Sequence, residues 1–284
     1  MIPAAFEYER AATLAAALKA VGTRNTKVMC GGQSLIPLLR FRLTQTKRVV
    51  DISHLKQLQG VSKAKGVIRI GAATTYRALL DAKVLRDDCP LLAEVTERIG
   101  DRQVRNIGTI GGGLAHADPS ADMPGAMLAL DAQFVVRSAK GRRTVAARDW
   151  FRGPFESAMK SGELLTDIMI AVPARGTGSA YESFEQAASG YPLVGAAAVV
   201  TRAKGKVTAA ALAFTGLGEV PFLAKGIEKL VGSDGGTAAV EKVAGGAAAG
   251  VDANEDIHAP AAYRLHLAKV AARRALLRAL ERAG

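Results

Sequence analysis

The chain has 284 residues, of which 49% are hydrophobic and 23% charged. This composition is globular and excludes a disordered or collagen-like chain, and no apolar stretch approaches the length of a membrane span. The 38 Lys and Arg residues exceed the 26 Asp and Glu residues by 12, which allows nucleic acid, an anionic cofactor or an acidic partner surface as ligand.

The first 56 residues are predicted to alternate helix and strand. Thr13 can cap an Ala/Leu-rich helix, and Thr26–Cys30 is predicted to be a short buried strand. Ser34 as cap and Pro37 in the first turn mark the next helix, and Arg48–Ile52 is the following strand. This βαβ-like order is expected to place a glycine turn at the N-terminus of the second helix.

Residues 57–175 are predicted to form a second unit. Its expected elements are a strand at Val67–Ile70, helices near Thr75–Ala82 and Leu91–Ile99, a glycine-rich loop from Asn106 to Pro119, a helix near Asp122–Leu130, a hairpin of Gln133–Arg137 and Arg143–Ala146, and a strand at Leu165–Val172.

The order of elements changes after the polar, glycine-rich residues 175–179. We expect strands at Ser179–Gln186, Ala196–Arg202 and Val207–Phe214, and then three helices. Consecutive strands followed by helices predict an α+β domain with a three-stranded antiparallel sheet. We therefore divide the chain into domains 1–175 and 176–284.

The last predicted helix is amphipathic and basic. Its charged residues are Arg264, Lys269, Arg273, Arg274, Arg278 and Arg282 against Glu281. This pattern fits a solvated basic face, and it also fits docking to a partner subunit. Nucleic-acid binding is disfavoured, because only 5% of the residues are aromatic and none forms a stacking platform among these arginines.

Two glycine-rich stretches are candidates for anion binding. Residues 31–34 (GGQS) and 108–113 (GTIGGG) allow backbone amides to approach an anion closely, although each stretch alone is also typical of a plain connection. The second stretch lacks the G-x-G-x-x-G order and follows a predicted helix, which argues against a Rossmann site. The chain has no P-loop motif either.

In their wider context the two stretches are specific. Residues 31–40 (GGQSLIPLLR) and 105–122 (RNIGTIGGGLAHADPSAD) closely resemble the FAD-binding medium subunit of molybdenum hydroxylases, the carbon-monoxide dehydrogenase and xanthine dehydrogenase family. Further similar pieces are residues 50–52 (VDI), 70–72 (IGA), 163–165 (ELL) and 188–191 (ASGY). The resemblance implies a vanillyl-alcohol-oxidase/PCMH-like FAD domain of two subdomains, 1–56 and 57–175, followed by the C-terminal α+β domain.

The resemblance also implies a set of FAD-binding residues. They are Cys30, Gly31, Gly32, Gln33, Ser34, Leu35, Ile99, Gly100, Val104, Gly108, Thr109, Gly111, Gly112, Gly113, Ala115, Ala121, Asp122 and Leu165. Cys30–Leu35 would wrap the diphosphate, with Gly108, Thr109, Gly112 and Gly113 on its other side. Asp122 would bond the ribityl or diphosphate region, and Leu165 would touch the flavin ring.

Three further residues have alternative roles. Tyr191 either gates the flavin ring or is a packed surface aromatic residue. His116 either contacts the cofactor or is a hydrogen-bonded loop residue, and Asp118 before Pro119 either caps a turn, which is the commoner role, or touches a ligand. The chain departs from the family pattern at Gly113, where Asn or Ser is frequent, and at Glu182 and Ser183, where a lysine is expected.

The resemblance predicts an electron-transfer flavoprotein subunit with FAD as its own cofactor. Electrons would arrive from [2Fe–2S] clusters of a small subunit, after oxidation of a substrate at the molybdenum cofactor of a large subunit, in a dimer of heterotrimers. The two cysteines, Cys30 and Cys89, are too few to ligate iron–sulfur clusters, which agrees with partner-held metal centres.

Two alternatives remain: a stand-alone FAD-dependent oxidase or reductase, and a non-catalytic basic interaction module. The first ten residues have no secretory pattern, so we expect a cytoplasmic protein that could also associate peripherally with the inner face of the membrane.

Overall fold

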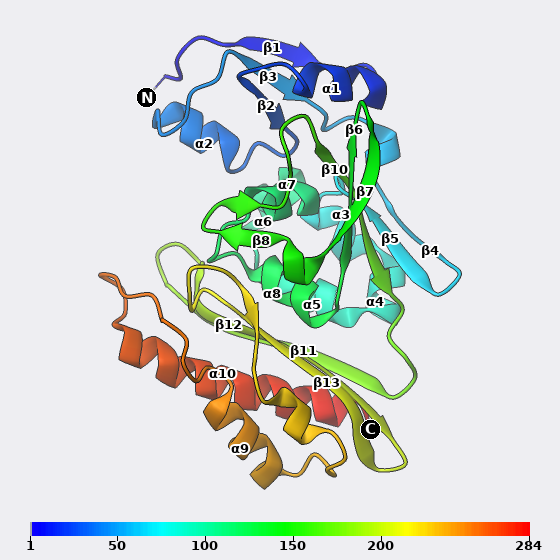
Figure 1. Cartoon of the computed structure of the whole chain (residues 1–284), viewed down its shortest axis with the longest axis vertical. Helices are drawn as coiled ribbons and strands as arrows, with labels where there is room; N and C mark the ends of the chain where they lie inside the picture. Colours follow the sequence, from blue (N-terminus) through cyan, green and yellow to red (C-terminus); the bar gives the residue numbers. More distant parts are fainter. Residues whose placement is uncertain (1) are drawn as a thin grey trace.

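The computed structural model describes residues 2–284, and its elements follow one another along the long axis of the molecule (Figure 1). A small N-terminal sheet lies at one end, and a larger sheet with its helices lies in the middle. The C-terminal sheet and its two α-helices lie at the other end.

The N-terminal unit is a three-stranded parallel sheet with two helices. Its strands, in sheet order, are β1 (Glu7–Arg10), β3 (Arg48–Asp51) and β2 (Thr26–Met29), and its helices are α1 (Leu14–Val21) and α2 (Leu35–Arg40). Thr13 caps α1, because its hydroxyl accepts a hydrogen bond from the amide of Ala16 at 3.1 Å. The expected βαβ order is confirmed, whereas β1 was not predicted from its exposed, charged sequence.

The middle unit is built on a five-stranded antiparallel sheet. In sheet order its strands are β4 (Val61–Ala64), β5 (Val67–Gly71), β10 (Leu164–Ala171), β6 (Gln133–Ser138) and β7 (Gly141–Ala146). Its helices are α3 (Tyr76–Asp81), α4 (Lys83–Asp88), α5 (Pro90–Arg98), α6 (Arg102–Ile107), α7 (Ile110–His116) and α8 (Asp122–Ala129). Short elements complete it: the 3₁₀ turns η1 (Lys56–Leu58) and η2 (Ala147–Asp149) and the hairpin of β8 (Phe151–Gly153) and β9 (Glu156–Ser157).

The glycine-rich segment 106–119, expected to be a loop, is largely helical. The Thr109 hydroxyl caps α7 by accepting a hydrogen bond from the amide of Gly112 at 3.3 Å. A Cβ atom at Gly111 would lie 2.4 Å from the Cβ of Ala72, so glycine lets α7 pack directly on the chain that follows β5. This contact outweighs the low helix propensity of three consecutive glycines.

The C-terminal domain contains four strands, not three. Its elements are β11 (Thr177–Glu185), β12 (Pro192–Ala203), β13 (Lys206–Thr215), β14 (Phe222–Leu223), the 3₁₀ turn η3 (Ile227–Leu230), α9 (Thr237–Gly246) and α10 (Ala261–Arg282). The three long strands and their antiparallel pairing agree with the prediction. β14 has only two residues and η3 only four, which is too short for hydrophobic periodicity to reveal.

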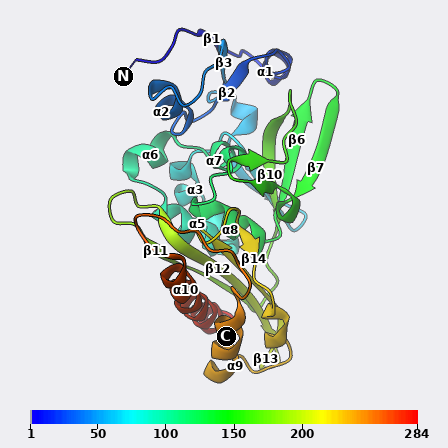
Figure 2. The ribbon, with the colours of Figure 1, turned by 60° about the vertical axis from the view of Figure 1, so that its left-hand side comes forward.

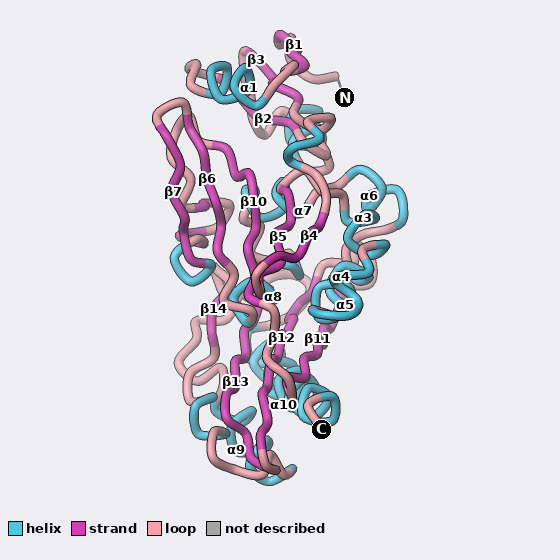
Figure 3. Tube along the Cα trace, turned by 90° about the vertical axis from the view of Figure 1, so that its right-hand side faces the viewer, coloured by secondary structure: helices cyan, strands magenta, loops and turns pink. Residues whose placement is uncertain are grey.

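The C-terminal sheet is covered on both faces. Helix α10 packs against β11 and β12, while α5 and α8 of the middle unit contact the same sheet (Figures 2 and 3). The core of the middle unit accordingly includes Tyr181, Ala197 and Ala213 of the C-terminal sheet. Among residues 2–284, no helix combines the length and apolar character needed to cross a membrane.

Candidate functional site

A cavity of about 480 Å³ lies where the three parts of the chain meet. Its walls come from β2 and the turn before α2, from α6 and α7, from the start of α8, from β10, and from the loop that precedes β12. All eighteen residues predicted to bind FAD line this cavity, together with Tyr191, His116 and Asp118. The structure therefore brings together every candidate residue of the sequence.

The two glycine-rich segments touch each other at this cavity. A Cβ atom at Gly31 would lie 2.4 Å from the carbonyl oxygen of Ile107 and 2.8 Å from the Cα of Gly108. Gly32 has φ of +72°, which disfavours residues with a side chain. Glycine is thus required for the turn and for the close approach of the two segments.

Ser34 differs from its predicted role as a side-chain cap. It occupies the N-cap position of α2, but its hydroxyl makes no capping hydrogen bond. Its φ and ψ of −104° and −46° are close to helical, whereas a capping side chain needs an extended backbone. The Ser34 hydroxyl therefore remains available at the cavity wall, whereas the Ile36 amide already donates a hydrogen bond to the Gly32 carbonyl at 3.0 Å.

Cys30 and Tyr76, two titratable side chains of the cavity wall near these glycines, are neutral. Burial raises the pKa of the Cys30 thiol to about 11, against the opposing effect of a hydrogen bond with Thr109. Burial also raises the pKa of the Tyr76 hydroxyl well above its usual range. Both side chains are therefore neutral at pH 7, and amide and hydroxyl groups provide the polar character of this wall.

Tyr76 also explains one departure from the family pattern. A Cβ atom at Gly113 would lie 2.4 Å from the Tyr76 Oη, and Tyr76 itself lines the cavity. The tyrosine hydroxyl thus fills the space that a side chain at position 113 would need. Tyr76 was not predicted from the sequence, because it lies in a short helix that carries no binding motif.

Asp122, the first residue of α8, is the buried carboxyl group of the cavity, with 5% of its surface exposed. Its Oδ1 accepts a hydrogen bond from the Tyr181 hydroxyl at 2.7 Å. Burial raises the pKa of Asp122 to about 7, despite the opposing effect of this hydrogen bond. Asp122 can therefore change its protonation state near neutral pH.

The remaining candidates lie at the edge of the cavity. Tyr191 is 47% exposed and follows Ser189 and Gly190 in a turn, so it both lines the cavity and reaches solvent. His116 packs against Phe155 with ring centroids 5.1 Å apart. Asp118 forms the expected turn, since its Oδ1 accepts a hydrogen bond from the amide of Ser120 at 2.9 Å.

Several cavity residues were not predicted from the sequence. They are Lys27, Val28, Met29, Leu38, Thr44, Ile52, Ala72, Tyr76, Met123, Pro124, Met159, Leu164, Ser189 and Gly190. Most are apolar side chains of helices and strands whose patterns indicate only a buried face. No signal in the sequence separates a residue that faces a cavity from one that faces the core.

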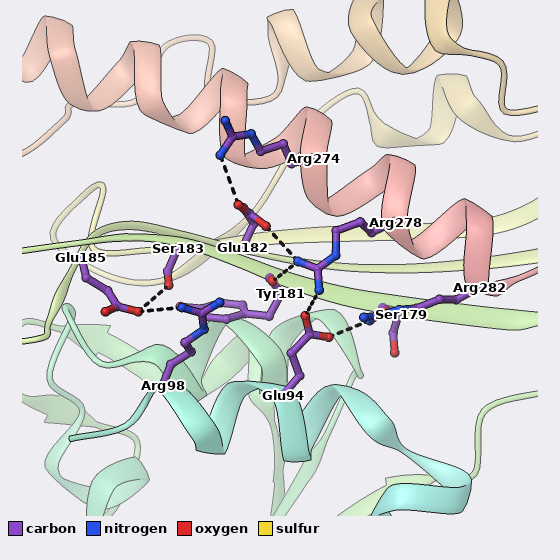
Figure 4. A network of polar contacts seen from close by, with 10 residues as sticks. All are labelled: Glu94, Arg98, Ser179, Tyr181, Glu182, Ser183, Glu185, Arg274, Arg278 and Arg282. Atoms are coloured by element: carbon purple, nitrogen blue, oxygen red, sulfur yellow. Dashed lines mark hydrogen bonds and ion pairs between the residues drawn. The ribbon is translucent and has the colours of Figure 1, made fainter. Parts of the chain in front are cut away.

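Positions 182 and 183, where the family lysine was expected, do not line the cavity. Glu182 instead accepts hydrogen bonds from Arg274 at 3.4 Å and Arg278 at 2.9 Å (Figure 4). The presence of Glu182 and Ser183 in place of the family lysine therefore affects the packing of α10 in this chain. It does not directly change the cavity wall.

Several arginines on the basic side of α10 pair with acidic residues of the same chain, while Lys269, Arg273, Arg274 and Arg282 keep exposed side chains. Arg278 and Arg282 both bond Glu94 of α5, with the Arg282 contact at 2.6 Å (Figure 4). Arg264 at the other end is 4% exposed and bonds Asp256 at 2.7 Å. The arginines predicted to form a surface face are thus used within the chain.

Comparison with known proteins identifies the family. The model for the FAD binding domain in molybdopterin dehydrogenase matches residues 4–174, and that for the CO dehydrogenase flavoprotein C-terminal domain matches residues 179–279. The chain belongs to the FAD-binding medium chains of molybdopterin dehydrogenases. Like them, it is an FAD-binding oxidoreductase subunit.

Several relatives in this family match over nearly their full length. The carbon monoxide dehydrogenase medium chain of Afipia carboxidovorans is 37% identical over 100% of this chain and 99% of its own. The glyceraldehyde dehydrogenase medium chain of Sulfolobus acidocaldarius is 35% identical over 95% of this chain and 96% of its own. The structure of carbon monoxide dehydrogenase from Hydrogenophaga pseudoflava matches with a TM-score of 0.97 and 33% identity, covering 100% of both chains.

The predicted family, fold class and FAD cofactor are thereby confirmed. The cavity also fits the cofactor on its own geometry. Only the Thr109 Oγ1 lies within 4 Å of a Cβ atom built at Gly112, so a side chain there would extend into otherwise open space. A wall of glycine backbone and neutral donors is suited to the diphosphate of a dinucleotide.

Proposed function

We propose that this chain relays electrons within a molybdenum hydroxylase complex. It would receive them from [2Fe–2S] clusters of a small partner subunit, which a large molybdenum subunit reduces, and pass them to an external acceptor. FAD, when bound, supplies this chemistry because it accepts single electrons and delivers pairs. The observation that supports the proposal most strongly is the single cavity into which both glycine segments, Asp122 and Tyr191 converge.

Different residues of the cavity would bind different parts of FAD. We propose that Cys30–Leu35 hold the diphosphate from one side, and that Gly108, Thr109, Gly112 and Gly113 hold it from the other. The other lining residues are Ile99, Gly100, Val104, Gly111, Ala115 and Ala121. Asp122 would accept hydrogen bonds from ribityl hydroxyls, because a carboxylate beside the diphosphate would be repelled.

We propose that the flavin ring lies against Leu165, Met159 and Tyr191. All three line the cavity, and Tyr191 is exposed, so the ring would lie among largely apolar side chains near solvent. Tyr191 would gate access of the acceptor to the ring. The two cysteines support partner-held clusters, since Cys30 lines the cavity and Cys89 is buried in the core.

The proposed assembly is a dimer of heterotrimers in the cytoplasm, with peripheral contact to the inner face of the membrane. Within the chain, we place the domain boundary between residues 175 and 176 and the subdomain boundary between residues 56 and 57. Limited proteolysis of the assembled complex tests these boundaries.

Purification of the tagged chain from its native host tests the proposed function. We expect one FAD per chain, co-purified subunits containing iron and molybdenum, and bleaching of the flavin absorbance on reduction with dithionite. FAD without iron or molybdenum, together with turnover of an alcohol by the isolated chain, would instead establish a stand-alone flavin enzyme. Absence of FAD and a steep salt dependence of nucleic-acid binding would favour the interaction module.

A further inference from the structure

Tyr181 connects the C-terminal sheet to the cavity, although it is not itself a lining residue. It lies in β11, is 1% exposed, and donates its hydroxyl proton to Asp122 Oδ1 at 2.7 Å. The two residues are 59 positions apart and belong to different domains. A buried tyrosine hydroxyl needs a partner, and here that partner is the carboxyl group of the cavity.

The neighbouring strand is shaped around this hydroxyl. A Cβ atom at Gly195 of β12 would lie 2.1 Å from the Tyr181 Oη and 2.8 Å from the Thr215 Cγ2. Glycine inside a strand weakens the strand, and here it provides the space that the hydroxyl occupies. The position of the Tyr181 hydroxyl is therefore fixed by its packing against Gly195 and by its hydrogen bond to Asp122.

Thr215 of β13 holds the segment just before Asp122. Its hydroxyl lies 2.6 Å from the carbonyl oxygen of Ala121 and 2.9 Å from that of Pro119. The amide of Gly216 donates to the same Pro119 oxygen at 2.9 Å. The C-terminal sheet thus fixes both the backbone and the side chain of the cavity wall at this point.

We propose that Tyr181 is a positioning residue of the cofactor site: its hydroxyl orients the Asp122 carboxyl group and stabilises the ionised form that accepts hydrogen bonds from the ribityl hydroxyls of FAD. This inference rests on the proposed role of Asp122. It implies that the FAD site is incomplete without the C-terminal domain, which contributes no side chain to the glycine wall.

The charged and titratable groups around Asp122 are consistent with this role. Arg98 of α5 favours its ionised form and Glu185 of β11 opposes it, and these two groups pair with each other at 3.3 Å (Figure 4). Tyr76 of α3 and Tyr191 also face Asp122. Burial raises the pKa of Tyr181 well above its usual value, so Tyr181 remains a donor throughout the neutral range.

The test is the pH dependence of FAD binding to the full chain after removal of its flavin. We compare the unaltered chain with Tyr181→Phe, Asp122→Asn and the control Tyr263→Phe, whose ring is 50% exposed on α10. FAD fluorescence quenching gives the dissociation constant between pH 5.5 and 8.5, and far-UV circular dichroism verifies folding.

We expect the affinity of the unaltered chain for FAD to fall as the pH drops through the pKa of Asp122. Tyr181→Phe should move the midpoint of this fall upward by roughly one pH unit, and weaken binding at pH 7 by up to about tenfold. Asp122→Asn should remove the pH dependence, and Tyr263→Phe should change neither quantity.

One result would contradict the proposed role of Tyr181, and another would contradict the proposed role of Asp122. If Asp122→Asn changes binding but Tyr181→Phe keeps the original midpoint, or weakens binding equally at every pH, the positioning role of Tyr181 is wrong. If Asp122→Asn binds FAD like the unaltered chain at every pH, the proposed role of Asp122 itself is wrong.

Discussion

Asp122 has an environment that opposes its ionisation in the folded protein. Its pKa rises from an ordinary value of 3.8 to about 7, mainly because the carboxyl group is buried. The folded state therefore holds this proton more tightly than the unfolded state between about pH 4 and pH 7. Across this window Asp122 contributes stability at the acidic end that is lost as the pH rises.

The flavin-free protein provides the measurement for Asp122. Urea denaturation at pH 4.5, 5.5 and 7 measures the unfolding free energies of the unaltered chain and of Asp122→Asn. As the pH rises, the unaltered chain should lose stability relative to Asp122→Asn. A constant difference across these pH values would mean that Asp122 titrates with its ordinary pKa.

Gly111 and Gly112 are adjacent but have different roles. A side chain at Gly111 would collide with Ala72, whereas one at Gly112 would meet only the Thr109 hydroxyl. We expect Gly111→Ala to lower the unfolding free energy by about 1–3 kcal/mol, because overpacking at a helix contact is destabilising.

The control for Gly111 is Gly245→Ala in α9, where nothing lies within 4 Å of a built Cβ atom. Alanine there should leave stability unchanged or raise it by up to about 1 kcal/mol, because alanine favours helix. Thermal or urea unfolding measures both variants. Equal stability of Gly111→Ala and Gly245→Ala would contradict the close packing of α7.

At the scale of elements, Glu94 joins α5 to α10 through two arginines. Its side chain is 17% exposed and accepts from Arg278 and Arg282 (Figure 4). Glu94→Gln should lower the unfolding free energy by about 2 kcal/mol, since charge-assisted bonds are stronger than neutral ones and partly buried pairs are weakly screened.

Glu241 of α9 is the matched control. It also pairs with an arginine of α10, Arg273, at 3.1 Å, but both side chains of this pair are about half exposed. Glu241→Gln should cost less than about 1 kcal/mol. Urea denaturation at low and high salt compares the two variants. If Glu94→Gln and Glu241→Gln cost the same, the Glu94 contacts do not hold the two domains together.

Long elements were predicted more completely than short ones. Thr13 as a cap, the long strands of the C-terminal sheet and α10 follow from patterns that extend over several residues. Helix α7 was missed, because its glycines oppose a helix in isolation and only the contact with Ala72 explains it. β14 offers too few residues for any periodic pattern.

For the whole molecule, the candidate site was predicted through resemblance and not through local pattern. Residues 31–34 and 108–113 indicate anion binding, but their contact across the cavity depends on the fold. The bond between Tyr181 and Asp122 joins two domains, so neither residue signals it alone. The arginines of α10 are visible in the sequence as a basic stripe, but their acidic partners on α5 and β11 are not. These contacts also depend on the fold.

We propose that the glycine wall of one cavity holds FAD. FAD content per chain, measured in Gly112→Leu and in the control Gly245→Leu, tests it most directly, with melting temperatures showing that both variants fold. We expect Gly112→Leu to lose its FAD and Gly245→Leu to keep one FAD per chain, because only the first leucine fills the cavity. A folded Gly112→Leu chain with full FAD content would contradict the account.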